Sequence, residues 1–297
     1  MSTLTRQRLM FGFVCLVWGS TWIAMKNGAT HVPPALFAGL RWTIAGIMQL
    51  FYVYWDTGRL RLPWNAMRAI LIVAVLVNTL NQLFMLYGLR YVASGIGAVI
   101  NSGLTPLSLL AFAMIGGHER LTKRVALAMG LGVLGIVVLF GPSAASGTLD
   151  GVTMLGAFLV MMGTLVYSAG SVLARPITQA HSPTLIAGLV SLIGGLTLLP
   201  ISFLFEPGTL LALRFDWGWG PWISFLFLLF PASLGATTIF MILVRDWGPS
   251  RAGSFAFISP ILAVFEGMLL NGEAMTPIEG IGMALMLGGA WFALRKG

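Results

Sequence analysis

Three side-chain amides stand close together inside one apolar stretch of the chain. Asn78, Asn81 and Gln82 lie within about one helical turn, and Met85 extends the same stripe at a spacing of three to four residues. An unpartnered amide facing hydrocarbon is costly, so these groups are expected either to line a wet cavity or to hydrogen-bond to another helix. Because amides both donate and accept, such a cavity would suit a zwitterionic solute, and Asn101 is a fourth candidate.

Aromatic, methionine and hydroxyl side chains recur on one helical face in each of two other apolar stretches. These residues are Trp18, Thr21, Trp22 and Met25 in one stretch, and Thr164, Tyr167, Ser168 and Ser171 in the other. An aromatic wall with an adaptable methionine and hydroxyls suits varied side chains of a bound molecule, and ordinary helix packing is the alternative. Thr237 and Phe257 are weaker candidates for the same site.

Two charged residues, Arg41 and Glu266, lie inside apolar runs. A charge within a membrane span is a functional hypothesis that needs a named partner. The two residues are expected to pair with each other, or one of them to bind a carboxylate or an amine of a substrate. Snorkelling of either side chain to the membrane surface is the alternative.

Two prolines, Pro106 and Pro260, stand in the middle of apolar runs. Each removes the helical hydrogen bond to the carbonyl four residues back, at Ser102 or Ala256. In lipid that carbonyl must find another partner or face water. The two positions are therefore predicted hinges, with a static kink as the alternative.

The composition defines the elements that must position these residues. Of the 297 residues, 58% are hydrophobic and only 9% are charged, and the mean hydropathy is +0.91. A soluble domain carries about 25% charged residues, so the class is a polytopic α-helical membrane protein. The net charge of +8 resides in short loops between apolar runs, which is typical of topology determinants rather than of nucleic-acid binding.

Ten membrane spans are predicted, joined by mostly short loops. They cover roughly 8–26, 34–55, 66–88, 94–115, 122–141, 151–174, 183–205, 221–244, 251–270 and 277–295. Thirteen loop Lys and Arg residues fall on one side, and only Lys26, Arg90 and Arg214 fall on the other. Both termini are therefore expected in the cytoplasm. The longest outer loop, 206–220, is interpreted as an interfacial aromatic anchor or as a lid over a vestibule.

The chain contains an internal duplication. At a constant offset of 154 the second half repeats the first, with the matches Pro106/Pro260, Met114/Met268, Glu119/Glu273, Thr122/Thr276 and Gly135/Gly289. At an offset of 149, Trp18 matches Tyr167 and the segment 34–40 matches 183–189. Residues 1–145 and 146–297 are thus predicted to be two five-helix repeats. Since five is odd, the second repeat must be inverted, as in many secondary transporters with a central site.

Chemistry other than transport finds little support in the sequence. Cys15 is the one cysteine, and the three histidines fall in predicted loops, so neither a disulfide nor a metal site is expected within the chain. An intramembrane enzyme would need converging acids, histidines or metal ligands inside the spans. Nothing resembles a phosphate loop for ATP. Neither a cofactor nor a catalytic residue is therefore expected.

Four motifs resemble the drug/metabolite transporter superfamily in its ten-span EamA branch. They are Trp18-Gly-Ser-Thr21, Pro34-Ala-Leu-Phe-Ala-Gly-Leu-Arg41, Tyr87-Gly-Leu-Arg-Tyr91 with Gly95-Ile-Gly-Ala98, and Thr105-Pro106 with Glu119-Arg-Leu-Thr122. Within that superfamily the chain is most similar to bacterial exporters of aromatic amino acids. The resemblance implies a central cavity lined by spans 1, 3, 4, 6, 8 and 9. It also implies that spans 2 and 7 lie outside and that spans 5 and 10 pack together.

The expected function is therefore export of aromatic and other neutral amino acids by alternating access. Export of other metabolites or drugs by proton antiport is the alternative, and a channel is a weaker one. The expected location is the bacterial inner membrane. The partners are a small-molecule substrate and the lipid bilayer, without nucleic acid, and the chain is expected to act as a monomer, with dimerisation as the alternative.

Overall fold

The computed structural model describes most of the chain as helices. The described residues are 3–58, 60, 64–116, 123, 126–127, 130–135, 137–138, 150–237, 239–240, 242–243, 255–272 and 274–294. No strand occurs among them. The fifth predicted span, 122–141, falls largely outside the described residues.

The helices of the first half lie close to the predicted spans. They are α1 (Thr3–His31), α2 (Pro34–Thr57), α3 (Trp64–Ala74), the π-helical segment η1 (Val75–Leu80), α4 (Asn81–Leu89) and α5 (Ser94–Ile115). The elements α3, η1 and α4 follow one another without a break, so they form one rod that corresponds to the third predicted span.

The second half contains a similar succession of helices. They are α7 (Gly151–Ala180), α8 (Pro183–Phe205), the short α9 (Thr209–Ala212), α10 (Trp219–Phe227), the π-helical segment η2 (Leu228–Ala236), α13 (Phe255–Asn271) and α14 (Pro277–Leu294). The segment η2 continues α10 and contains Pro231.

Seven described helical rods are long and apolar enough to cross a membrane. They are Thr5–His31, Pro34–Thr57, Ala66–Leu89, Ser94–Ile115, Gly151–Ala180, Pro183–Phe205 and Trp219–Ala236. Two shorter apolar helices, Ile258–Leu270 and Gly280–Gly289, fall where the ninth and tenth spans are predicted. The protein is thus an all-helical bundle with several membrane spans, and the total of ten stays a prediction.

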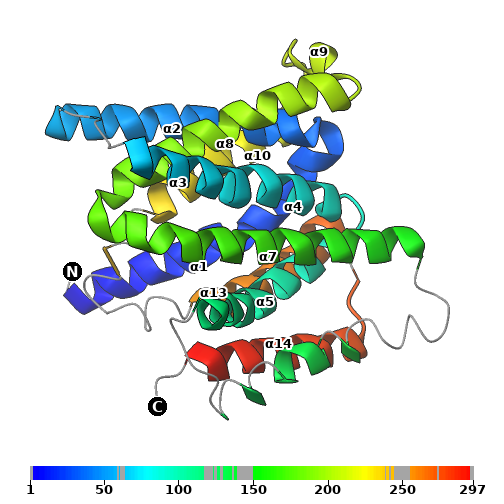
Figure 1. The fold of residues 1–297 in the computed structure, drawn as a ribbon. Coiled ribbons are helices and arrows are strands. Elements are labelled where there is room, and N and C mark those ends of the chain that lie inside the picture. Colours follow the sequence, from blue (N-terminus) through cyan, green and yellow to red (C-terminus); the bar gives the residue numbers. More distant parts are fainter. Residues whose placement is uncertain are drawn as a thin grey trace.

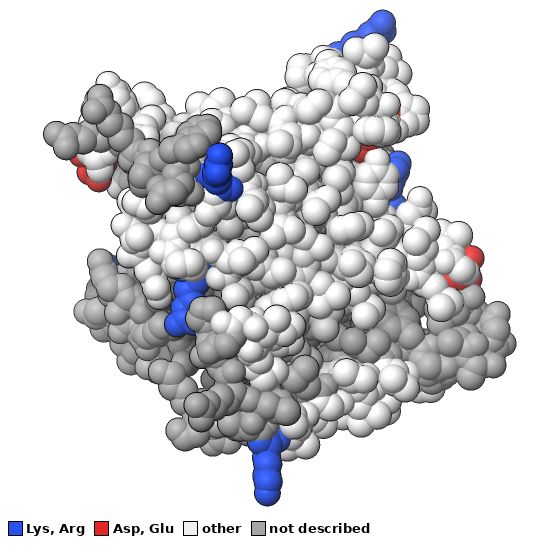
Figure 2. All heavy atoms as spheres, viewed as in Figure 1, with Lys and Arg blue, Asp and Glu red and all other residues white. Residues whose placement is uncertain are grey.

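The rods run side by side, and the charges collect at their ends (Figures 1 and 2). α1 begins and α14 ends at the same end of the bundle, while α9 lies at the opposite end. The face shown in Figure 2 is uncharged across its centre, with charged side chains toward its margins. Such a belt fits the hydrocarbon core of a bilayer.

Proline and glycine set the ends of the outer pair of helices, α2 and α8. Pro34 and Pro183 stand at the first helical position of each, where a missing amide hydrogen costs nothing. Gly58 ends α2 in the left-handed conformation at φ 66°, and its N–H donates to Tyr54 O at 2.8 Å. The duplicated segment thus begins equivalent helices in the two halves.

Glycines let α2 and α8 pack closely along much of their length. A β-carbon at Gly46 would lie 2.7 Å from Leu192 Cα, and one at Gly39 would lie 3.3 Å from Gly195 O. A larger residue at Gly46 would require movement of the α8 backbone, and one at Gly39 would first displace the side chain of Leu199. Small residues at such contacts are typical of helix association in lipid. Spans 5 and 10 are also in contact, since Gly135 approaches Gly282 O and Met286 of α14.

Candidate functional site

A cavity of about 300 Å³ lies inside the bundle, where helices of the two halves meet. Its lining residues are Trp22, Met25, Asn81, Gln82, Met85, Asn101, Ser102, Thr105, Tyr167 and Phe255. They come from α1, α4, α5, α7 and α13. These helices correspond to five of the six spans expected around a central cavity; no lining residue comes from the described part of span 8. Seven residues of the predicted candidate faces are brought together here: Trp22, Met25, Asn81, Gln82, Met85, Asn101 and Tyr167.

A chain of hydrogen bonds runs from a buried arginine to the amides of the cavity wall. Arg41 Nη2 donates to Gln82 Oε1 at 3.0 Å, and Gln82 Nε2 donates to Asn81 Oδ1 at 3.1 Å. Asn81 Nδ2 then donates to the backbone carbonyl of Gly163 on α7 at 3.0 Å. Arg41, Gln82 and Asn81 are all at least 93% buried. The chain therefore connects α2, α4 and α7 inside the bundle.

The two ends of this chain fix the direction of every bond in it. A guanidinium can only donate, so the oxygen of Gln82 must face Arg41, and a carbonyl can only accept, so the nitrogen of Asn81 must face Gly163. Each amide nitrogen carries a second hydrogen that these bonds do not use. Since both residues line the cavity, the wall has N–H donors to offer, polarised by the buried positive charge of Arg41. Such a wall favours a negatively charged acceptor.

Hydroxyl groups of α5 and α7 lie behind the wall, and one of them, Thr105, lines it. Thr164 Oγ1 lies 3.1 Å from the Asn101 side chain, and Ser168 Oγ lies 2.6 Å from Ser108 Oγ. Thr105 Oγ1 is buried without a hydrogen-bond partner although Thr105 lines the cavity. A buried hydroxyl without a partner is costly, and a polar molecule in the cavity would relieve that cost.

The proline of α5 adds an acceptor to the same wall. Pro106 has no amide hydrogen, so the carbonyl of Ser102 loses its helical donor. Ser102 itself lines the cavity. The α4 donors and Ser102 of α5 therefore line the same cavity. Pro260, the repeat equivalent in α13, is buried, and the side chain of Pro106 lies outside the described ones.

Aromatic side chains form another part of the lining. Trp22 is 7% exposed and Tyr167 is 39% exposed, and Phe255 completes the set. Trp18 was predicted to line the binding site, but it is not among the lining residues. It lies behind Phe255, with the two ring centroids 4.4 Å apart. Its ring also contacts Phe240 at 5.1 Å. The tryptophan thus supports the aromatic wall from outside.

Several other predicted site residues lie away from the cavity. Asn78 donates to Val190 O on α8 at 3.2 Å, because the π-helical turn η1 precedes Asn81 and rotates Asn78 off the expected stripe. The hydroxyls of three further residues bond to their own helices: Thr21 to Trp18 O, Ser171 to Tyr167 O and Thr237 to Ala232 O. Thr164 and Ser168 are fully buried behind the lining. The side chain of Phe257 lies outside the described ones.

The lining also includes three residues that the sequence did not single out for binding: Ser102, Thr105 and Phe255. Thr105 adjoins the duplicated proline, so it carried a usable signal. Phe255 had none, since it is one phenylalanine among 19.

The predicted pair between Arg41 and Glu266 is wrong. The structure describes both side chains and gives them different partners: Arg41 bonds to Gln82, and Glu266 Oε1 lies 2.8 Å from Ser20 Oγ. Arg41 also stacks over Trp42 with its guanidinium carbon 4.4 Å from the ring centroid. The two charges thus belong to separate helix contacts, α2 with α4 and α1 with α13.

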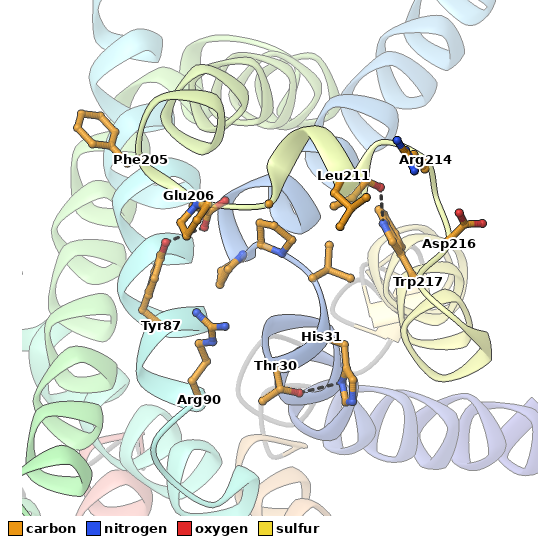
Figure 3. Close-up of a pocket in the computed structure, with 16 residues that line it drawn as sticks. Thr30, His31, Tyr87, Arg90, Phe205, Glu206, Leu211, Arg214, Asp216 and Trp217 are labelled. Atoms are coloured by element: carbon orange, nitrogen blue, oxygen red, sulfur yellow. Dashed lines mark hydrogen bonds between the residues drawn. The ribbon is translucent and has the colours of Figure 1, made fainter.

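A second cavity of about 710 Å³ opens at the α9 end of the bundle (Figure 3). We call it the α9 vestibule; its lining includes Thr30, His31, Tyr87, Arg90, Glu206, Arg214, Asp216 and Trp217. Glu206 is 7% exposed and accepts hydrogen bonds from Ala35 N at 2.8 Å, Tyr87 Oη at 2.7 Å and Ser202 Oγ at 2.5 Å. One carboxylate thus ties the start of α2, the end of α4 and the end of α8 together.

Apolar packing separates the α9 vestibule from the central cavity. Met25, which lines the central cavity, packs in one cluster with Ala29 and Leu86, which are at most 1% exposed. Next to them in the chain, Thr30 and Tyr87 line the vestibule. Trp217, which also lines the vestibule, stacks on Trp222 with ring centroids 4.8 Å apart, and both rings contact Phe225 of α10. Apolar side chains thus pack between residues that line the two cavities.

These features define a class of protein: a multi-pass membrane protein with a cavity lined by helices of its two halves. The model of the EamA-like transporter family matches residues 8–141 and again residues 154–295. The chain therefore belongs to the EamA-like transporter family and is a membrane transporter. The family predicted from the sequence motifs is confirmed.

Individual relatives agree with this class. The chain is 29% identical over 273 residues to the uncharacterized inner membrane transporter YedA of Escherichia coli, covering 92% of this chain and 85% of YedA. It is 25% identical over 279 residues to an uncharacterized transporter of Archaeoglobus fulgidus, covering 94% and 95% of the two chains. A solved crystal structure shares the fold with a TM-score of 0.63 at 21% identity, over 97% of this chain and 96% of that one.

Proposed function

We propose that the protein exports neutral amino acids, aromatic ones among them, across the bacterial inner membrane by alternating access. The cargo binds in the central cavity, between the two halves of the chain. Its carboxylate accepts hydrogen bonds from Gln82 and Asn81, and its side chain lies against Trp22, Tyr167 and Phe255. The α9 end faces the periplasm, and both termini face the cytoplasm.

The observation that carries this proposal is the directed hydrogen-bond chain from Arg41 to Gly163. The buried guanidinium has no acidic partner among the described residues, and its Nε is unbonded. A buried charge without a counter-charge is expensive. A carboxylate in the cavity supplies negative charge near the guanidinium and accepts from the unused amide hydrogens of Gln82 and Asn81. This is the chemistry that separates an amino acid from an amine or a neutral alcohol.

The remaining polar groups suit the other end of a zwitterion. The freed carbonyl of Ser102 and the unpartnered hydroxyl of Thr105 can accept from an ammonium group. The cavity volume of about 300 Å³ lies at the lower end of the usual range for small-molecule sites. A single amino acid with a large side chain fits that size better than a peptide.

Alternating access rests on the duplication. Two separate stretches, one in each half of the chain, match the same family model. The equivalent helices α2 and α8 pack against each other through glycines. Two inverted five-helix repeats, 1–145 and 146–297, would account for both observations and would place the cargo near the midplane.

The test is counterflow of radiolabelled amino acids into proteoliposomes that hold the purified protein. Wild type is expected to exchange L-phenylalanine and other neutral amino acids, but not phenethylamine, which lacks the carboxylate. Gln82→Leu removes the amide donors of Gln82 and is expected to reduce apparent affinity about 10- to 150-fold, since hydrogen bonds to charged groups contribute about 1.5–3 kcal/mol.

Asn78→Leu is the matched control, because it makes the same amide-to-leucine change in the same rod, outside the cavity. It is expected to leave the apparent affinity for L-phenylalanine unchanged while lowering thermal stability. Equal exchange of phenethylamine and L-phenylalanine would contradict carboxylate recognition. Absence of exchange for every amino acid in the panel would contradict the proposed cargo class.

A further inference from the structure

The α9 vestibule is a charged cavity that the central cargo site does not use. Its volume of about 710 Å³ lies within the usual range for small-molecule sites. Arg90 lines it from the end of α4, and Arg214 and Asp216 line it from the loop after α9, on the other side in the view of Figure 3. Two separate parts of the fold thus bring both signs of charge to one space.

These charges are not paired with one another. Arg214 and Asp216 form no side-chain hydrogen bond or ion pair within the part of the chain that the structure describes. Arg90 lies over the ring of Tyr87, with 6.0 Å between its guanidinium carbon and the ring centroid, and it too has no ion pair among the described residues. Cationic and anionic groups that line one cavity without pairing are available to a ligand.

The other acidic residue of the vestibule, Glu206, is already engaged by the protein. Its carboxyl group accepts hydrogen bonds from Ala35 N at 2.8 Å, Leu36 N at 3.3 Å and Tyr87 Oη at 2.7 Å. The bond to Tyr87 also fixes the ring over which Arg90 lies. Asp216 is therefore the carboxylate that the vestibule offers to a cation.

The loop that contains Arg214 and Asp216 has an unusual backbone held by aromatic packing. Phe215, between them, is the one residue other than glycine with a positive φ, 62°, in the described part of the chain. This conformation is unfavourable for a bulky side chain. Trp222 Nε1 donates to the carbonyl of Phe215 at 3.0 Å, and Trp217 stacks on Trp222. The loop is thus held in the turn from which both charged residues line the vestibule.

We infer that the α9 vestibule is a second binding site, which holds a zwitterionic α-amino acid after it leaves the central cavity. Arg90 binds the carboxylate, Asp216 binds the ammonium group, and the ring of Trp217 packs against the side chain. The inference rests on the proposed function, because the same molecule first occupies the central cavity. Apolar packing separates the two sites, so each can hold a molecule at the same time.

The mixed charge of the vestibule selects the class of ligand. A simple anion would bind the arginines but meet the negative charge of Asp216. A simple amine would bind Asp216 but meet the positive charges of Arg90 and Arg214. A molecule that carries both charges satisfies both signs, and like-charge contacts disfavour the others.

The first test counts the bound molecules by equilibrium dialysis of radiolabelled L-phenylalanine against the full-length protein in lipid nanodiscs. Wild type is expected to bind two molecules per chain at saturation. Arg90→Gln is expected to weaken one of the two sites about 10- to 150-fold, because it removes a charged partner of the carboxylate. Gln82→Leu is expected to weaken the other, central site and to leave the vestibule site intact.

Arg68→Gln is the matched control for Arg90→Gln. It makes the same change at an exposed position near the opposite end of the rod formed by α3, η1 and α4. It is expected to bind two molecules as wild type does. Loss of one site in Arg68→Gln as well would show that the effect of Arg90→Gln is not local to the vestibule and would overturn the inference.

The second test examines recognition of the ammonium group in the Gln82→Leu protein, whose remaining site is the vestibule. Adding Asp216→Asn is expected to weaken binding of L-phenylalanine. N-acetyl-L-phenylalanine lacks the ammonium group, so it is expected to bind the Asp216→Asn protein at least as tightly as the protein that retains Asp216. Unchanged binding of L-phenylalanine in Asp216→Asn would overturn the assignment of a zwitterion site.

The outcomes separate this inference from the proposed function. One bound molecule per chain, lost in Gln82→Leu and retained in Arg90→Gln, overturns the vestibule site and leaves the central cargo site standing. Two bound molecules that are both insensitive to Arg90→Gln also overturn it. Binding that responds to Arg90→Gln but not to Gln82→Leu supports the vestibule site and contradicts the central one. Absence of all binding overturns the inference, and counterflow then decides the proposed function.

Discussion

Tyr87→Phe is expected to open the α9 end of the bundle. The substitution removes a single hydroxyl, which donates to Glu206 Oε1 at 2.7 Å. Glu206 keeps its bonds to Ala35 N and Ser202 Oγ, so the fold of each helix end is preserved. What is lost is the link between α4 in the first half of the chain and the loop after α8 in the second.

The magnitude follows from the type of bond. Tyr87 Oη donates to Glu206 beside the backbone N–H groups of Ala35 and Leu36, which donate to the same carboxyl group. A hydrogen bond to a charged group contributes about 1.5–3 kcal/mol. If that bond exists only in the closed state, the ratio of open to closed protein rises about 10- to 150-fold.

The assay is modification of one engineered cysteine in the central cavity. Cys15 is buried in α1 and is first replaced by alanine. Met25→Cys then places a thiol in the cavity wall, and a membrane-impermeant maleimide is added on the α9 side. Tyr87→Phe is expected to raise the labelling rate by up to the factor above, because labelling requires an open path from that side.

Tyr91→Phe is the matched control, since Tyr91 is on the same rod end, 41% exposed, and does not reach Glu206. It is expected to leave the labelling rate unchanged. Equal labelling rates in wild type and Tyr87→Phe would show that the bond to Glu206 does not hold this end closed, and the two-state reasoning would then be wrong.

Three further substitutions test the packing and the cavity. Gly46→Ala would drive a β-carbon into Leu192 of α8 and is expected to cost about 1–3 kcal/mol of stability, measured by thermal unfolding against Gly12→Ala, which has open space around it. Pro106→Ala restores a donor for the Ser102 carbonyl and is expected to reduce transport more than stability; transport at the wild-type rate would remove the hinge role. Tyr167→Leu is expected to lower the preference for aromatic over aliphatic amino acids in competition assays, and an unchanged preference would exclude Tyr167 from the side-chain pocket.

Much of the architecture could be predicted because membrane spans depend on composition over long stretches. The runs near 34–55 and 183–205 became α2 and α8, and proline at the start of each made their beginnings predictable. The amides Asn81 and Gln82 are predictable as cavity or contact residues because a polar group in a membrane span must avoid the lipid. These features are predictable from sequence because a buried polar group without a partner, or a proline inside a helix, is energetically costly.

The rest depended on contacts that spacing does not reveal. Asn78 was assigned to the cavity on regular helical geometry, but the π-helical turn η1 changes the register before Asn81. Arg41 and Glu266 were paired because they were the only clear intramembrane charges, whereas their real partners, Gln82 and Ser20, are neutral. The role of Glu206 could not be predicted from its position in a loop, because Glu206 connects three helix ends that come together only in the folded protein.

The most direct test of the central claim is a structure of the protein with L-phenylalanine bound. The carboxylate is expected within hydrogen-bond distance of Gln82 Nε2 and Asn81 Nδ2, with the ring against Tyr167 or Phe255. A ligand held in the central cavity with its carboxylate away from these amides, or bound only in the α9 vestibule, would contradict the account.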